Sequence, residues 1–311
     1  GLYQNISKSD TNYNNALYEL SYAYYADSQY DKSLQAAAEG IRLFPEMKGK
    51  FMLLQASVLD DMDKKTEAIQ MYTQCIQLDV FDYSAHYNRA VTYNQMEQYD
   101  SAFADLKKCL LINPFYASGH YLMAMHYLRK GNIVASVLAL QTYLIIAPEG
   151  RYLNGSIQWL SKIAKASDDV MEYAAKADDS QLGSFAPIQA VLLSKAALDK
   201  SYKLKVSLED NIVRQVQVVN EQLQIDAGSD DFAQQVYVPF LKQLMDKNYF
   251  EPHVYTMFGG LDIADIQNWN KRNKKVTEPY FAFANDYLRL IRITQEMTFN
   301  KRAQCTQCYL F

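Results

Sequence analysis

The sequence predicts an all-α chain in which similar helix pairs stack into a solenoid and are followed by a further helical region. The chain resembles itself at a spacing of 34 residues, and a fixed period of this length is typical of stacked helical repeats. Within each copy, apolar residues recur every three or four positions, as on one face of an α-helix. Only 11 Gly and 7 Pro interrupt the 311 residues, which favours long helices over a turn-rich β fold.

Composition and charge restrict the class of protein. Apolar residues make up 49% of the chain, enough for a buried core without disulfide or metal crosslinks. The net charge is −4, which argues against a nucleic-acid partner because such partners require clustered basic residues. No run of about 18 apolar residues marks a membrane-spanning helix. The sequence carries no signal for an oligomeric state.

The start of the chain bears on its compartment. The first residue is Gly1 rather than Met, and no charged start followed by an apolar block marks a signal peptide. Gly1 is either the first residue after a removed leader or a residue left by cloning. The first interpretation favours an exported or periplasmic protein of the bacterial cell envelope, and the alternative compartment is the cytoplasm.

Four copies of the repeat can be aligned in the first half of the chain. Pro114 and Pro148 lie 34 residues apart, and each ends the second helix of its copy because proline cannot continue a helix. Ala90 and Ala124 share this spacing and allow close approach of the two helices of a pair. The four copies cover residues 14–48, 49–82, 83–116 and 117–150.

This pattern resembles the tetratricopeptide repeat (TPR) family, whose first helix carries a small residue and a Tyr and whose second carries an Ala before a closing Pro. The third copy matches with Ala90, Tyr93, Ala102, Leu106 and Pro114. The resemblance implies a right-handed α-solenoid with a concave face lined by the first helix of each pair. His86 and His120 fill a position where the family often has Trp, so we interpret them as packing residues rather than a metal pair.

Residues 151–166 continue the phase of the repeats and are expected to form a capping helix, which closes an array at residues 1–166. Residues 167–311 lose the period and predict a second all-helical region, which either extends the solenoid with degenerate pairs or forms a small bundle. No further family is recognised there. Helical patterns occur at about residues 187–202, 208–225, 231–247, 252–258, 262–270 and 279–300.

No motif for catalysis, a cofactor or a metal is present. Cys305-x-x-Cys308 lacks the second ligand pair of a zinc site, and we expect no chemistry there, with a local disulfide as the alternative. Cys75 and Cys109 occupy equivalent positions in adjacent repeats and are expected to be buried core thiols. The four His support no Ser–His–Asp order. The acidic run at residues 60–63 lacks the Gly and distal Glu of a calcium loop, and we interpret it as a solvated turn.

The candidate site is the concave face that the resemblance implies. Chaperone-binding members of the family hold a terminal carboxylate there with Lys, Arg and Asn. In this chain, Tyr87, Tyr121, Val91 and Met125 stand where several of those residues would be, so the carboxylate grip is expected to be missing. A groove rich in Tyr and Asn suits an extended or helical segment. The predicted groove residues are Tyr18, Tyr22, Tyr25, Tyr87, Asn88, Asn94, Tyr121, Met125 and Arg129.

Three functional hypotheses follow. The first is a non-catalytic scaffold or adaptor that binds a protein or peptide segment on the concave face; it predicts that Tyr87→Ala with Tyr121→Ala abolishes binding and leaves the fold intact. The second is a structural component of a cell-envelope assembly. The third is an enzyme with a site in the C-terminal helical region, which no motif supports. A competing arrangement for the groove is that the C-terminal helices fold back and fill it.

Overall fold

The structure, a computed structural model, describes residue 10 and residues 12–308, with side chains up to residue 294. It confirms the all-α class, because the described residues form helices and turns and no strand. The chain forms two compact units, residues 1–112 and 113–311, which we call the N-terminal and C-terminal units. The boundary between the units falls at the end of α6 (Tyr99–Ile112), after the third helix pair. The division that the sequence predicts, at residue 166, remains a prediction.

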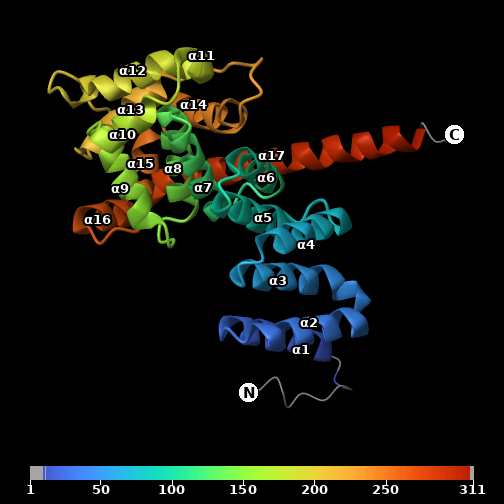
Figure 1. The fold of residues 1–311 in the computed structure, drawn as a ribbon. Coiled ribbons are helices and arrows are strands. Elements are labelled where there is room, and N and C mark those ends of the chain that lie inside the picture. Colours follow the sequence, from blue (N-terminus) through green and yellow to red (C-terminus); the bar gives the residue numbers. More distant parts are fainter. Residues whose placement is uncertain (1–9, 11, 309–311) are drawn as a thin grey trace. The chain divides into compact units, whose positions relative to one another are not determined.

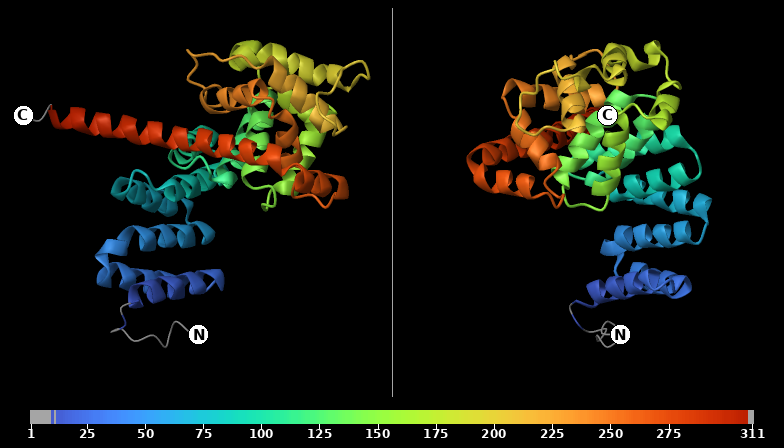
Figure 2. Two further views of the ribbon diagram at one scale, coloured as in Figure 1. Left: turned by 180° about the vertical axis from the view of Figure 1, so that it is seen from behind. Right: turned by 90° about the vertical axis from the view of Figure 1, so that its left-hand side faces the viewer.

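The N-terminal unit is a solenoid of three helix pairs (Figures 1 and 2). The two helices of each pair pack against each other, and the second helix of one pair packs against the first helix of the next. The first helices also contact one another in succession, α1 with α3 and α3 with α5. The pairs are α1 (Tyr13–Ala26) with α2 (Tyr30–Leu43), α3 (Lys48–Asp61) with α4 (Lys65–Leu78), and α5 (Tyr83–Gln95) with α6 (Tyr99–Ile112).

The turn inside each pair has the same backbone conformation. Ser28, Asp63 and Glu97 adopt φ values of 56°, 61° and 59° just after the first helix, and Gly131 adopts 79° at the equivalent place in the fourth pair. A left-handed residue at this position ends a helix by turning the chain away from its axis. Three of the four positions accept a residue with a side chain, so glycine spacing does not mark this turn in the sequence.

Small residues bring the helices of the N-terminal unit together. Ala56, Ala68, Ala90 and Ala102 have no exposed surface, and they lie at equivalent positions on the two helices of the second and third pairs. Cys75 and Cys109 are buried free thiols on α4 and α6, as the sequence predicts. Burial is the main cause that raises the pKa of the Cys75 thiol to about 11, so this group is a packing residue and not a thiolate.

The C-terminal unit is built around the helix α8 (Ile133–Ile146). Every residue of α8 from Ile133 to Leu144 is buried, and the helix is contacted by α7, α9, α12, α15 and the π-helix Ala233–Tyr237. The other helices of the unit are α7 (Ala117–Arg129), α9 (Leu153–Ala164), α10 (Asp168–Ala174), α11 (Asp179–Leu182), α12 (Ala186–Ser194), α13 (Asn211–Gln222), α14 (Val238–Asp246), α15 (Phe250–Met257), α16 (Ala264–Arg272) and α17 (Lys274–Cys308).

The C-terminal helices lie close to the expected ranges, with a few differences. The short helices α10 and α11 were not expected, and the helix expected at residues 187–202 ends at Ser194, where Lys195 adopts a φ of 61°. A helix, α9, forms within residues 151–166; it packs on α8 and is itself contacted by α12 and α13. None of the described helices is long and apolar enough to cross a membrane. Cys305 and Cys308 lie where the structure describes the backbone alone.

Candidate functional site

The candidate surface lies on the first helices of the three pairs in the N-terminal unit. We use the name A-helix face for the surface that side chains of these three helices, α1, α3 and α5, form together. Because α1 contacts α3 and α3 contacts α5, residues of the three helices form one continuous surface. Six of the nine predicted groove residues belong to α1 and α5, and the other three belong to α7 of the C-terminal unit.

The α1 part of the face is a cluster of tyrosines. Tyr22 is 50% exposed, and its ring meets the ring of Tyr25 edge to face with centroids 6.0 Å apart. The Tyr25 hydroxyl donates a hydrogen bond of 2.7 Å to Oδ2 of Asp61 at the end of α3. Tyr18 is half-buried and packs edge-on against the buried ring of Phe51. These contacts hold the three rings in place, and Tyr22 presents the largest exposed part.

The α3 and α5 parts carry amide and hydroxyl groups. The Asn88 amide donates a hydrogen bond of 3.4 Å to the Ser57 hydroxyl, which links α5 to α3. Asn94 is half-buried one turn and a half further along α5, and its side chain makes no hydrogen bond within the described residues. Tyr87, in contrast, is only 6% exposed and belongs to the core of the unit. Of the predicted groove residues on α5, Asn94 is therefore the one with an unused polar group.

A buried ion pair connects α5 to the second helix of its own pair, α6. Asp105 of α6 is 5% exposed and accepts hydrogen bonds from Arg89 Nε at 2.7 Å and from His86 Nδ1 at 3.0 Å. Burial on its own raises the pKa of the Asp105 carboxyl, but the hydrogen bonds from Arg89 and His86 outweigh it and hold the pKa below the ordinary value. Arg89 also donates to Thr73 of α4. The network fixes α5 relative to α4 and α6.

The three predicted residues on α7 have different surroundings. Tyr121 stacks face to face on Tyr152, with ring centroids 4.1 Å apart and planes 3° apart. Met125 is half-buried, and Arg129 is exposed at the end of the helix. Tyr121 therefore uses one of its ring faces inside the C-terminal unit.

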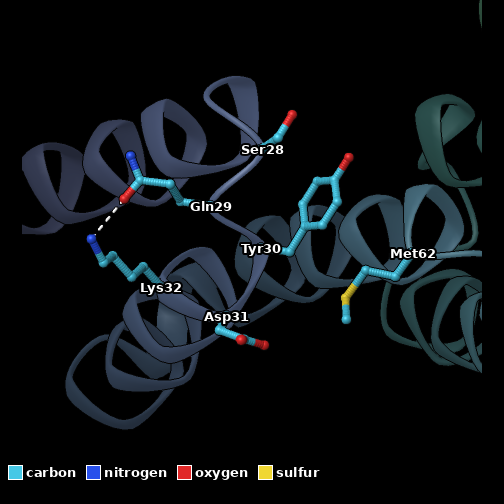
Figure 3. A pocket seen from close by; sticks show the side chains of 6 residues that line it. All are labelled: Ser28, Gln29, Tyr30, Asp31, Lys32 and Met62. Carbon is cyan, nitrogen blue, oxygen red and sulfur yellow. Dashed lines mark hydrogen bonds between the residues drawn. The ribbon is translucent and has the colours of Figure 1, made fainter.

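A cavity of about 390 Å³ opens at the turns of the first two pairs in the N-terminal unit (Figure 3). Tyr30 and Met62, from neighbouring repeats, form its apolar part, and the Asp31 carboxylate points toward the Met62 side. Lys32 points the other way and donates a hydrogen bond of 2.7 Å to Gln29 Oε1. The cavity adjoins the tyrosine cluster, since the Tyr25 and Tyr30 ring centroids lie 6.4 Å apart.

The acidic run at residues 60–63 differs from the solvated turn that we expected. Asp60 is buried on the last turn of α3 and pairs with Lys65 at 3.2 Å, and Asp61 accepts the Tyr25 hydroxyl. Only Asp63 stands in the turn itself. Sequence reasoning missed Asp61 and the cavity residues as site candidates. Two features of the sequence could have pointed to them. The carboxylates at residues 60–63 follow Asp31 by about one repeat, and the chain is unusually rich in Tyr.

His120 and His253 are structural histidines. His120 is fully buried; its Nε2 donates a hydrogen bond of 2.8 Å to the carbonyl oxygen of Pro114, and its Nδ1 accepts one of 2.8 Å from the Tyr237 hydroxyl. His253 is fully buried between Tyr280 and Gln141, each at 3.0 Å. Burial lowers the pKa of His120 to about 4 and that of His253 to about 3. Within the part of the chain that is described, no three His, Cys, Asp or Glu side chains gather as metal ligands do.

Comparison with known proteins identifies the repeats. Two protein-family models described as tetratricopeptide repeat match the sequence, one over residues 83–116 and the other over residues 50–79. This part of the chain consists of tetratricopeptide repeats. The helices after the repeats belong to no family that we recognise. TPR arrays are protein–protein interaction scaffolds, and the repeats place this chain in that general class.

One of the solved structures that align with this chain is described as "MamA RS-1 ArsTM double mutant". It is 15% identical to this TPR protein, with a TM-score of 0.41. The match covers 52% of this chain and 91% of that chain.

Proposed function

We propose that this TPR protein is a non-catalytic scaffold that binds a peptide or protein segment along the A-helix face. The observation that supports the proposal most directly is the state of the polar side chains there. The Tyr22 hydroxyl and the Asn94 amide belong to rigid helices, reach solvent and have no hydrogen-bond partner among the described residues. Aromatic rings with a free polar tip are typical of protein interfaces, because they supply buried area and a directed hydrogen bond together.

The preferred surface variant combines Tyr22→Ala with Asn94→Ala. Neither side chain contributes a hydrogen bond to the fold, so the helices should stay intact. Tyr87→Ala, which the sequence suggested, is a poor probe because Tyr87 is 6% exposed and its truncation would leave a cavity in the core. A matched control is Leu78→Ala, since Leu78 is 54% exposed on the second helix α4 of the same unit.

The experiment is affinity capture of partners from native lysate with wild type, the double variant and the control. We expect a partner that wild type and Leu78→Ala capture equally and that Tyr22→Ala with Asn94→Ala does not. Circular dichroism of the three proteins should be identical. A partner captured equally well by all three proteins would place the binding surface outside the A-helix face and refute the proposal.

A further inference from the structure

The charge of the chain is divided unequally between its two units. Residues 1–112 hold 10 Lys and Arg against 15 Asp and Glu, a net charge of −5, whereas residues 113–311 hold 21 against 20. The whole acidic excess of the protein therefore lies in the unit that carries the A-helix face. A field of this sign attracts a basic partner and repels an acidic one.

Two carboxylates beside the cavity at the first two turns lack a cationic partner. Asp31 lines the cavity, and Asp61 directly precedes the cavity residue Met62 in the chain and accepts a hydrogen bond from the Tyr25 hydroxyl. Neither makes an ion pair within the described residues. Two of the nearby lysines are engaged elsewhere: Lys32 bonds to Gln29 and lies 5.6 Å from the Tyr24 ring centroid, and Lys65 pairs with Asp60. The two turns together carry five carboxylates, Asp27, Asp31, Asp60, Asp61 and Asp63, against three lysines, Lys32, Lys64 and Lys65.

The walls of the cavity suit the stem of a long basic side chain. Lys and Arg have an apolar stem and a charged end, so they pack best where apolar groups lead to a carboxylate. Here the Tyr30 ring and the Met62 thioether line the same cavity as the Asp31 carboxylate, which points toward the Met62 side (Figure 3). The exposed ring of Tyr22 packs on the half-buried ring of Tyr25, whose hydroxyl bonds to Asp61, and the Tyr22 ring can bind a second cation through contact with its aromatic face.

We propose that this cavity binds a Lys or Arg side chain, and that the segment recognised on the A-helix face is therefore basic. This inference rests on the proposed function, because it assigns the chemistry of the segment that the face binds. One cation occupies the cavity against Asp31, and a neighbouring cation lies on the Tyr22 and Tyr25 rings beside Asp61. The charge selection is the opposite of a terminal-carboxylate grip, and it requires no contribution from the C-terminal unit.

The test uses the full chain with ¹³C-methyl-labelled methionine, because Met62 reports directly on the cavity. The Met62 signal is assigned with Met62→Leu. The probe is the capped peptide Gly-Arg-Gly-Arg-Gly, and its matched control has Glu in place of Arg. We expect the arginine peptide to shift the Met62 methyl signal in a saturable and salt-sensitive way and the glutamate peptide to leave it unchanged. The methyl signal of Met123, which is buried in the C-terminal unit, should not move.

Two variants separate specific recognition from general charge attraction. Asp31→Asn with Asp61→Asn should weaken binding of the arginine peptide by about tenfold, because both charge partners are removed. Asp246→Asn, at an exposed carboxylate that ends α14, lowers the total negative charge in the other unit and should leave the affinity unchanged. Equal binding of the two peptides, a Met62 signal that neither peptide moves, or equal loss in both variants would overturn the inference.

The same variants distinguish failure of this inference from failure of the proposed function. A natural partner lost in Tyr22→Ala with Asn94→Ala but retained in Asp31→Asn with Asp61→Asn would overturn the basic-segment inference and leave the face as the binding surface. A cavity that takes the arginine peptide in a protein whose natural partner ignores the face would overturn the proposed function instead.

Discussion

Acid should destabilise the C-terminal unit through its two fully buried histidines. His253 contacts Gln141 Oε1 through Nε2 and the Tyr280 hydroxyl through Nδ1. Because the amide oxygen of Gln141 only accepts, Nε2 carries the proton and Nδ1 accepts from Tyr280. Burial favours this neutral form and lowers the pKa of His253 to about 3 and that of His120 to about 4.

The sign of the effect follows from proton uptake. Above about pH 6.5 each histidine is neutral in both the folded and unfolded states, and its contribution to stability is fully present. Below that pH the unfolded chain binds a proton that the folded chain does not, so stability is lost as the pH falls. The loss levels off near the folded values, about 4 for His120 and about 3 for His253.

The magnitude depends mainly on the unfolded pKa. Between pH 7.5 and pH 5, the unfolded state of each histidine gains about 1.5 pH units of protonation free energy, about 2 kcal/mol. The two residues together should lower the free energy of unfolding of the C-terminal unit by about 4 kcal/mol.

Tryptophan fluorescence isolates the unit in which this change occurs. The chain has 2 Trp, and both Trp159 and Trp269 belong to the C-terminal unit. We would measure urea unfolding at pH 7.5 and pH 5 for wild type and for His253→Gln with His120→Gln. The double variant should be less stable at pH 7.5 but should lose about 4 kcal/mol less on acidification. The reasoning is refuted if the variant and wild type have the same pH dependence.

Three further changes test the packing of the two units. Asp105→Asn should destabilise the N-terminal unit by about 2–4 kcal/mol, because it leaves the partly buried Arg89 without its charge partner, and faster amide hydrogen exchange in α5 and α6 would report it. Gly40→Ala places a Cβ atom 2.3 Å from the ring of Phe51; the cost should exceed the gain in helix propensity of about 1 kcal/mol, so exchange in α2 should become faster and Phe51→Leu should partly restore it. Gln189→Leu removes the acceptor of the Ile133 amide and the donor to the Gly131 carbonyl, and the urea midpoint by Trp fluorescence should fall by an amount equivalent to about 1–3 kcal/mol.

The helix pairs could be predicted because their determinants are local. The spacing of Ala90 and Ala124 reports close packing within a pair, and Pro114 and Pro148 report where each pair ends. The repeats at residues 50–79 and 83–116 match the family models. A short-range pattern of this kind needs no knowledge of distant contacts, and the structure confirms the fold class.

The surroundings of the fourth pair could not be predicted in the same way. His120 contacts Tyr237, 117 residues later in the chain, and Gln141 contacts His253, 112 residues later. Such contacts depend on tertiary packing, and they leave no periodic pattern in a single sequence. One signal was present, since residues 133–146 are apolar on all sides. A helix of that composition is covered all round, and this predicts further helices packed on α8.

The contrast between the two units explains where a partner should be sought. In the C-terminal unit, Gln141 and Asn220 exchange hydrogen bonds with each other, and Gln189 bonds to the turn before α8. These amides are buried, so they must be bonded inside the protein and cannot serve a partner. On the A-helix face, Tyr22 and Asn94 are held by rigid helices with their polar atoms unused. A partner that bonds to them has no internal bond to displace, and this difference makes the face of the N-terminal unit the more favourable surface for recognition.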